Sequence, residues 1–276
     1  MHQIKRLDLM IAYSCNLSCG GCISVSDRLR SGVAPVEDVQ AWITQWKQIL
    51  EPGVIAIFGG EPCLHPDLIE ICQLVRHAWP NSTIRLITNG YLLDNFDSGS
   101  WFKFEPFEIQ VSIHRSDHEH IINKNIAKII KHHTKWKVIP SNQPKGHEKI
   151  RWQRPHFSIY KSWFKDFVVP YQGSPDDPKP WHSDPAQAHA ICGAPNTPIL
   201  YKGLLYKCPA VANVIDVSGE NWFAYKACSG EDTLTEFISG IGHPESVCAQ
   251  CPEQQQAQII DHWNPINVIV KQKNIS

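Results

Sequence analysis

The sequence predicts an α/β protein in which a partial (β/α)6, TIM-like barrel is followed by a small cysteine-rich domain. Short apolar runs alternate with amphipathic segments over the first 160 residues, and most cysteines gather in one N-terminal and one C-terminal group. Such alternation is typical of parallel strands joined by crossover helices. We expect the barrel at 1–165, a linker or loop at 166–189, the cysteine-rich domain at 190–255 and a C-terminal tail at 256–276.

Six apolar runs are the predicted strands of the barrel. They are Leu7–Tyr13, Val54–Phe58, Thr83–Thr88, Phe107–Ile113, Lys135–Ile139 and a run near His156–Tyr160. Functional residues of parallel α/β folds gather at the carboxyl ends of the strands. We therefore expect Cys15, Gly59, Asn89 and Ser112, which follow or end the first four runs, to meet at one edge.

Three segments between these runs are predicted to be helices. In Val36–Leu50 apolar residues recur at three- and four-residue steps, as on one face of an amphipathic helix. The second and third predicted helices are Leu68–Trp79 and Asp117–His133. Asp117 lies in the region where the N-cap of the third helix is expected. These helices supply the crossovers that parallel strands require.

The pattern changes after residue 165. Pro170–Pro185 contains five prolines and a glycine, which indicates a loop or linker. Pro198–Tyr201 and Leu204–Cys208 then flank Lys202 and Gly203, so a tight β-hairpin is predicted there.

The length, net charge and apolar runs of the chain limit the kinds of partner that we expect. The 276 residues are enough for a large core, and 26 Lys and Arg against 27 Asp and Glu give a net charge of −1. A near-neutral chain has no broad attraction for nucleic acid or anionic membrane. No apolar run approaches the ~20 residues that span a bilayer, and the N-terminus lacks a signal-peptide pattern. We expect a cytoplasmic protein with a small-molecule substrate, without nucleic-acid or membrane partners.

The N-terminal cysteines have the spacing C-x3-C-x2-C, formed by Cys15, Cys19 and Cys22. Clustered cysteines in a cytosolic protein indicate metal or redox chemistry, because disulfides are rare there. Three thiolates in one loop can each hold one iron of a [4Fe–4S] cluster and leave the fourth iron open. A zinc site is the alternative, although an obvious fourth ligand is missing.

This cysteine loop resembles that of the radical S-adenosylmethionine (radical SAM) superfamily. The resemblance implies that S-adenosylmethionine binds the open iron and is cleaved by one electron to a 5′-deoxyadenosyl radical, which takes a hydrogen atom from the substrate. It also implies an electron donor such as flavodoxin or ferredoxin. Gly21 replaces the aromatic residue usual in the family and would offer its backbone to the adenine.

Further motifs extend the resemblance along the chain. The Gly-Gly-Glu-Pro sequence after the second run is similar to the family motif that binds the methionyl amino group, and Ser112 falls near the expected ribose site. The resemblance implies cofactor contacts from Gly21, Gly59, Gly60, Glu61, Pro62, Asn89, Ser112 and His114. An ordinary turn at Asn89 and a core or surface role for His114 remain alternatives. No residue is singled out as catalytic.

The C-terminal group comprises Cys192, Cys208, Cys248 and Cys251, enough to ligate one metal centre fully. Its Cys…Gly-x4-Cys hairpin followed by C-x2-C resembles the twitch domain, the short form of the SPASM domain, which implies an auxiliary [4Fe–4S] cluster. A zinc ribbon is the alternative. Cys228 is a fifth candidate, interpreted as a free thiol.

An auxiliary cluster with four protein ligands suits electron transfer. The chain's size and cysteine layout resemble the small twitch-containing dehydrogenase that oxidises an aminocyclitol. We therefore expect a radical SAM oxidoreductase that dehydrogenates a small polar metabolite, such as a sugar or cyclitol, with the auxiliary cluster as electron acceptor. A peptide-modifying (RiPP) maturase and a non-catalytic Fe–S or zinc scaffold or electron carrier are the alternatives.

Overall fold

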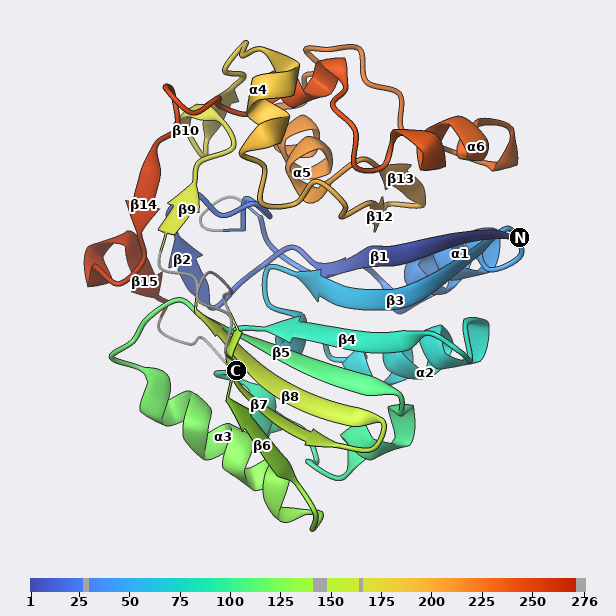
Figure 1. The fold of residues 1–276 in the computed structure, drawn as a ribbon, viewed down its shortest axis with the longest axis vertical. Coiled ribbons are helices and arrows are strands. Elements are labelled where there is room, and N and C mark those ends of the chain that lie inside the picture. Colours follow the sequence, from blue (N-terminus) through green and yellow to red (C-terminus); the bar gives the residue numbers. More distant parts are fainter. Residues whose placement is uncertain (27–29, 141–147, 164–165, 272–276) are drawn as a thin grey trace.

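A nine-stranded sheet runs through the middle of the computed structural model, which describes residues 1–26, 30–140, 148–163 and 166–271 (Figure 1). In spatial order the strands are β13 (Leu204–Tyr206), β12 (Ile199–Tyr201), β1 (His2–Ala12), β3 (Leu50–Gly59), β4 (Thr83–Thr88), β5 (Phe107–Ile113), β8 (Phe157–Trp163), β7 (Glu148–Arg154) and β6 (Lys137–Pro140). Strands β12 to β8 run parallel, and the three others are antiparallel to their neighbours. The predicted α/β class is confirmed, and the sheet stays open among the described residues because its edge strands, β13 and β6, do not pair.

Helices α1 (Val36–Trp46), α2 (Leu68–Ala78) and α3 (Glu119–Lys131) pack against the sheet. Alternate residues of β1, beginning with Leu7 and Leu9, join the buried side chains of these helices in the main core. The three predicted helices are confirmed with shorter ends. Asp117 does not cap α3, because its carboxylate pairs with Arg115 at 2.5 Å and the N-cap residue is His118.

The predicted order of the last two barrel strands is wrong. The run Lys135–Ile139 forms β6, which lies at the sheet edge and pairs antiparallel with the unpredicted β7. The parallel neighbour of β5 is β8, close to the predicted sixth strand. The apolar residues of β6 were misleading because they are not core residues: Val138 is 62% exposed and Ile139 42% exposed.

The second half of the chain is built onto the same sheet. The predicted hairpin is confirmed as β12 and β13, with Lys202 and Gly203 at positive φ in the turn, and β12 extends the main sheet beside β1. The stretch predicted as a linker contains regular elements: β9 (Asp166–Val168), β10 (Gln172–Ser174), β11 (Asp177–Lys179) and α4 (Pro185–Ala190). Helices α5 (Pro209–Ser218) and α6 (Glu231–Gly240) follow. The predicted domain limits stay a prediction, and the first of them falls at residues 164–165, outside the described residues.

Short elements complete the fold. The short 3₁₀ helices are η1 (Pro62–Leu64), η2 (Leu93–Asn95), η3 (Ser100–Phe104), η4 (Ser246–Gln250) and η5 (Pro265–Asn267). Strand β14 (Ile259–Asp261) pairs with β9, and β15 (Val268–Val270) pairs with β2 (Leu17–Cys19) in the cysteine loop. The predicted tail thus returns to the N-terminal cysteines (Figure 1). Among the described residues, every helix is too short or too polar to cross a bilayer.

Candidate cofactor site

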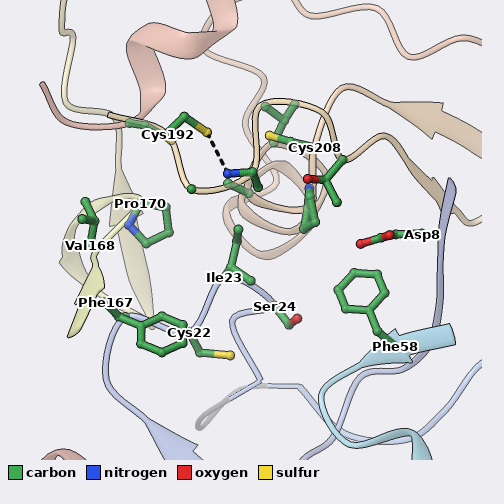
Figure 2. A pocket seen from close by; sticks show the side chains of 18 of the residues that line it. Asp8, Cys22, Ile23, Ser24, Phe58, Phe167, Val168, Pro170, Cys192 and Cys208 are labelled. Carbon is green, nitrogen blue, oxygen red and sulfur yellow. Dashed lines mark hydrogen bonds between the residues drawn. The ribbon is translucent and has the colours of Figure 1, made fainter. Parts of the chain in front are cut away.

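A cavity of about 500 Å³ lies at the carboxyl ends of β3, β4 and β5 and borders both groups of cysteines. Its wall includes Cys15, Cys19, Cys22, Cys192, Cys208, Cys248 and Cys251. Figure 2 shows Cys22 on one side and Cys192 and Cys208 on the other, with Asp8 and Phe58 to one flank. The fold therefore brings together two groups of thiols that lie some 170 residues apart in sequence.

The three N-terminal cysteines pack together around Leu17 and Val268. The Leu17 backbone N–H donates to Cys15 Sγ at 3.4 Å, and the Asn89 side-chain amide approaches the same sulfur at 3.7 Å. Burial raises the pKa of the Cys15 thiol to about 12, and nearby Glu61 and Cys22 add to this effect. Deprotonation here needs a compensating cation, which a bound iron would supply. The donor set of three clustered thiols thus fits the predicted iron–sulfur cluster.

Gly59 and Gly60 allow the end of β3 to touch the start of the cysteine loop. Gly59 has φ +155°, and a Cβ added there would lie 2.1 Å from the Ala12 carbonyl oxygen. A Cβ on Gly60 would lie 2.2 Å from the Ser14 carbonyl oxygen. Only glycine fits such close backbone contact. Both glycines line the cavity.

Glu61 and Pro62, which are also predicted cofactor contacts, do not line the cavity. The carboxylate is buried and accepts hydrogen bonds from Cys63 N at 3.0 Å, Thr88 Oγ1 at 2.6 Å and Asn89 N at 2.8 Å. Burial raises the pKa of Glu61, and these hydrogen bonds partly oppose that rise. Glu61 therefore joins the ends of β3 and β4 beneath the cavity.

The other predicted cofactor residues all border the cavity: Gly21, Asn89, Ser112 and His114. The Asn89 side-chain amide donates to Asn16 Oδ1 at 2.7 Å, which ties the β4 turn to the cysteine loop. Burial lowers the pKa of His114 to about 3, with a smaller contribution from His262. His114 is thus neutral at physiological pH, and one of its two ring nitrogens offers a lone pair.

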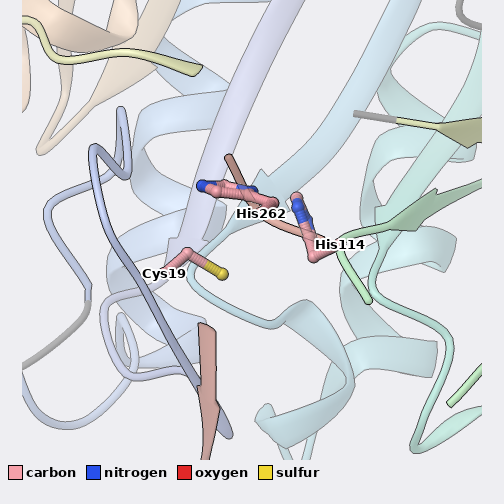
Figure 3. A group of neighbouring side chains, drawn as sticks. All are labelled: Cys19, His114 and His262. Atoms are coloured by element: carbon pink, nitrogen blue, oxygen red, sulfur yellow. The ribbon is translucent and has the colours of Figure 1, made fainter. Parts of the chain in front are cut away.

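The structure places His262 beside this loop, which the sequence did not predict. Its ring stacks on Phe167 at 4.1 Å between centroids and lies 5.5 Å from the ring of His114. Cys19, His114 and His262 form a compact group (Figure 3). No local motif surrounds His262, so only the long-range pairing of β14 and β15 brings it here.

The four C-terminal cysteines come from three elements. Cys192 follows α4, Cys208 is the N-cap of α5, and Cys248 and Cys251 lie in and after η4. Burial raises the pKa values of Cys192 and Cys251 and raises that of Cys208 to about 12, and neighbouring thiols of the group add to each rise. All four cysteines border the same cavity, and four thiols are enough to ligate one metal centre.

Cys228 lies apart from this group. It is buried, does not border the cavity, and its thiol contacts the Gly230 carbonyl oxygen at 3.4 Å and Thr233 Oγ1 at 3.3 Å. The interpretation that Cys228 is no ligand agrees with this position.

Polar residues of β1 and β5 that stand in no sequence motif also border the cavity. Arg6 donates to both carboxylate oxygens of Asp8, at 2.5 and 3.0 Å, and Gln110 lies nearby on the same wall. Burial raises the pKa of Asp8, and Arg6 opposes that rise. Asp8 could have been selected from the sequence, because it lies inside the apolar run of β1 and a buried carboxylate needs a partner.

Known proteins match parts of this chain. The family described as the radical SAM superfamily matches residues 9–139. GTP 3′,8-cyclase of Microcystis aeruginosa is 34% identical over 34% of this chain and 30% of its own length. PqqA peptide cyclase of Gluconobacter oxydans is 35% identical over 30% of this chain and 23% of its own. The matched stretch thus spans less than a third of either relative.

One solved structure resembles nearly the whole chain. The crystal structure of BtrN in complex with AdoMet and 2-DOIA has a TM-score of 0.53, covering 91% of this chain and 94% of that one. At 14% identity the similarity concerns the fold alone.

Proposed function

Since residues 9–139 of this chain are a radical SAM domain, we propose that the protein cleaves S-adenosylmethionine reductively and oxidises a small polar metabolite in the cavity between its two cysteine groups. The observation that carries this proposal is the single cavity bordered by all seven of these cysteines. A substrate held there would lie between a site that starts radical chemistry and a site that can accept an electron.

The N-terminal half of the site would bind the cofactor. When bound through Cys15, Cys19 and Cys22, a [4Fe–4S] cluster would supply the electron that cleaves S-adenosylmethionine to a 5′-deoxyadenosyl radical. Gly59 and Gly60 expose backbone groups at close range to such a ligand. Glu61 acts by holding the β3 and β4 ends in place.

The C-terminal half of the site would receive an electron from the substrate. Hydrogen-atom abstraction removes one electron equivalent from a substrate, and a two-electron oxidation must pass the second elsewhere. Four thiols can ligate a second [4Fe–4S] cluster completely, leaving no iron open to substrate. We assign this role to Cys192, Cys208, Cys248 and Cys251, in a twitch-like arrangement.

We propose a small polar substrate such as a sugar or cyclitol, and polar side chains on one part of the cavity wall support this choice. Buried Asp8 is paired with the partly exposed Arg6, and Gln110 and Ser112 add polar groups. Phe58 gives an apolar surface for a C–H face. The named peptide cyclase among the relatives makes a peptide substrate the second candidate. Flavodoxin or ferredoxin is the proposed electron donor, and the cytoplasm the proposed location.

The test is anaerobic reconstitution of the full chain, with iron and 5′-deoxyadenosine measured under dithionite. We expect about eight irons per chain, four for each cluster. The Cys15→Ala, Cys19→Ala, Cys22→Ala triple variant should hold half of this iron and form no 5′-deoxyadenosine. Cys228→Ala is the control and should match the parent in both. Cofactor cleavage by the triple variant would refute the radical SAM mechanism. If the parent protein instead holds half of the expected iron together with tightly bound zinc, the C-terminal cysteines form a zinc ribbon and not an auxiliary cluster.

A further inference from the structure

We propose that the cluster-free protein binds one zinc-class divalent ion between Cys19, His114 and His262. This site differs from the proposed cluster site, which uses Cys15, Cys19 and Cys22 and no histidine. The two share Cys19, so the ion and the cluster exclude each other. The inference does not rest on the proposed function, because it needs only the three side chains as the fold holds them.

The geometry of the three side chains is close to that of a metal site (Figure 3). One potential ligand atom from each residue lies within 4.8 Å of the other two, and the Cys19 sulfur points towards the histidine pair. Tetrahedral zinc, with bonds of about 2.0–2.3 Å, needs ligand atoms about 3.3–3.6 Å apart. Each pair of ligand atoms must therefore close by about 1.5 Å at most, which small side-chain rotations allow.

The hydrogen bonding of His262 also suits a metal ligand. Its Nε2 lies 2.8 Å from the Gly20 carbonyl oxygen, and a carbonyl can only accept, so Nε2 carries the hydrogen. Nδ1 then holds the lone pair that a metal takes. Ligating histidines usually donate their second ring nitrogen to a carbonyl or carboxylate in this way, which fixes the ring. Stacking on Phe167 holds the same ring from its face.

The donor set selects the ion. Two imidazoles and one thiolate suit zinc and its relatives, whereas magnesium and calcium prefer oxygen ligands. Cys19 and His262 are buried, and the group contains no carboxylate. Cys19 and His114 also border the cavity, so a fourth ligand such as water can reach the ion from that side.

Such an ion would be bound only while the cysteine loop holds no cluster. His262 comes from the chain between β14 and β15, some 240 residues beyond Cys19. An ion there would join this segment to the loop when no cluster is present and would have to leave before the cluster forms. Zinc-loaded protein should therefore take up iron and sulfide more slowly than metal-free protein.

The test is a titration of the anaerobic, metal-free full chain with Co²⁺, a coloured substitute for zinc. All proteins in this titration carry Cys248→Ala and Cys251→Ala, so that the four C-terminal thiols do not take the first equivalent; this double variant is the parent for the comparisons below. We expect one equivalent to give tetrahedral visible bands and a thiolate-to-cobalt charge-transfer band. Cys19→Ala should abolish the charge-transfer band. His262→Ala and His114→Ala should each weaken binding by more than about tenfold, since even the loss of a residue that supports a metal ligand costs about 10–100-fold.

Two controls separate this site from its competitors. His120 is an exposed histidine of α3, so the variant His120→Ala should bind Co²⁺ as the parent does. Cys15→Ala should also retain the first equivalent. If Cys15→Ala removes that equivalent while His262→Ala and His114→Ala leave it intact, the ion sits on the three cysteines and the proposal is wrong. Circular dichroism of each variant, unchanged from the parent, confirms that a loss of binding is not a loss of fold.

Discussion

At the scale of single residues, Glu61 shows how a motif residue can support a site without touching the ligand. Its carboxylate accepts hydrogen bonds from the η1 backbone at Cys63, the Thr88 hydroxyl and the Asn89 backbone. These donors lie after β3 and at the end of β4, and Asn89 in turn contacts Asn16 of the cysteine loop. A substitution at Glu61 would therefore affect the position of the cysteine loop through Asn89.

We predict that Glu61→Gln lowers the free energy of unfolding by about 1–3 kcal/mol. The amide can still accept from Cys63 and Thr88, but its NH2 group must face the Asn89 N–H, which leaves a buried donor without an acceptor. Urea unfolding of the variant measures the change. Glu70→Gln is the matched control, because Glu70 is exposed on α2, and should leave stability within about 0.5 kcal/mol of the parent. Equal stability of the two variants would contradict the bracing role of Glu61.

At the scale of elements, the segment from β14 to β15 completes the cysteine loop. Val268 pairs with Cys19, Gly20 N donates to the Asn267 carbonyl at 2.9 Å, and Lys271 N donates to the Asn16 carbonyl at 2.9 Å. The loop thus obtains backbone partners from the far end of the chain, where an isolated loop would bond to water. The segment holds the cysteines at fixed spacing.

Neighbouring residues of β15 allow a matched test of this role. Val268 is fully buried against Leu17 and Cys19, whereas Ile269 is 49% exposed. Val268→Ala removes about 1–2 kcal/mol of apolar packing from the loop, so the reconstituted variant should lose iron several-fold faster in air. Ile269→Ala should lose iron at the parent rate. The decay of visible absorbance follows both, and identical rates for the two variants would mean that β15 does not protect the loop.

These elements also mark the limit of prediction from sequence. Strands β4 and β5 were predicted with their observed bounds, because each is an apolar run with a clear turn after it. The three-residue strands β2 and β15 have no periodicity to detect, and they pair across some 250 residues. His262 was missed for the same reason. The cysteine groups were found because their spacing alone indicates metal chemistry, whereas the burial of Glu61 required the position of β4.

At the scale of the whole molecule, the C-terminal region is joined to the barrel by shared structure. Strand β12 extends the sheet beside β1, and Met10 of β1 packs with Ile199 and Tyr201 in a second core. Arg30 pairs with Asp216 of α5 at 2.9 Å and lies over the ring of Tyr201 at 5.3 Å. The two cysteine groups face one cavity because these contacts fix the region against the sheet.

We therefore predict that a chain truncated after residue 189 is insoluble or aggregates. Removing β12 exposes the edge of β1 at Asp8 and Leu9, together with the apolar side chain of Met10, which is 0% exposed in the intact chain. An exposed hydrophobic edge strand is a template for association. The full chain with Cys248→Ala and Cys251→Ala, which loses only ligands, should stay soluble and monomeric. Size-exclusion chromatography after equal expression compares the two. A truncated chain that runs as a monomer and unfolds cooperatively would instead make the barrel an independent domain and support the predicted boundary near residue 165.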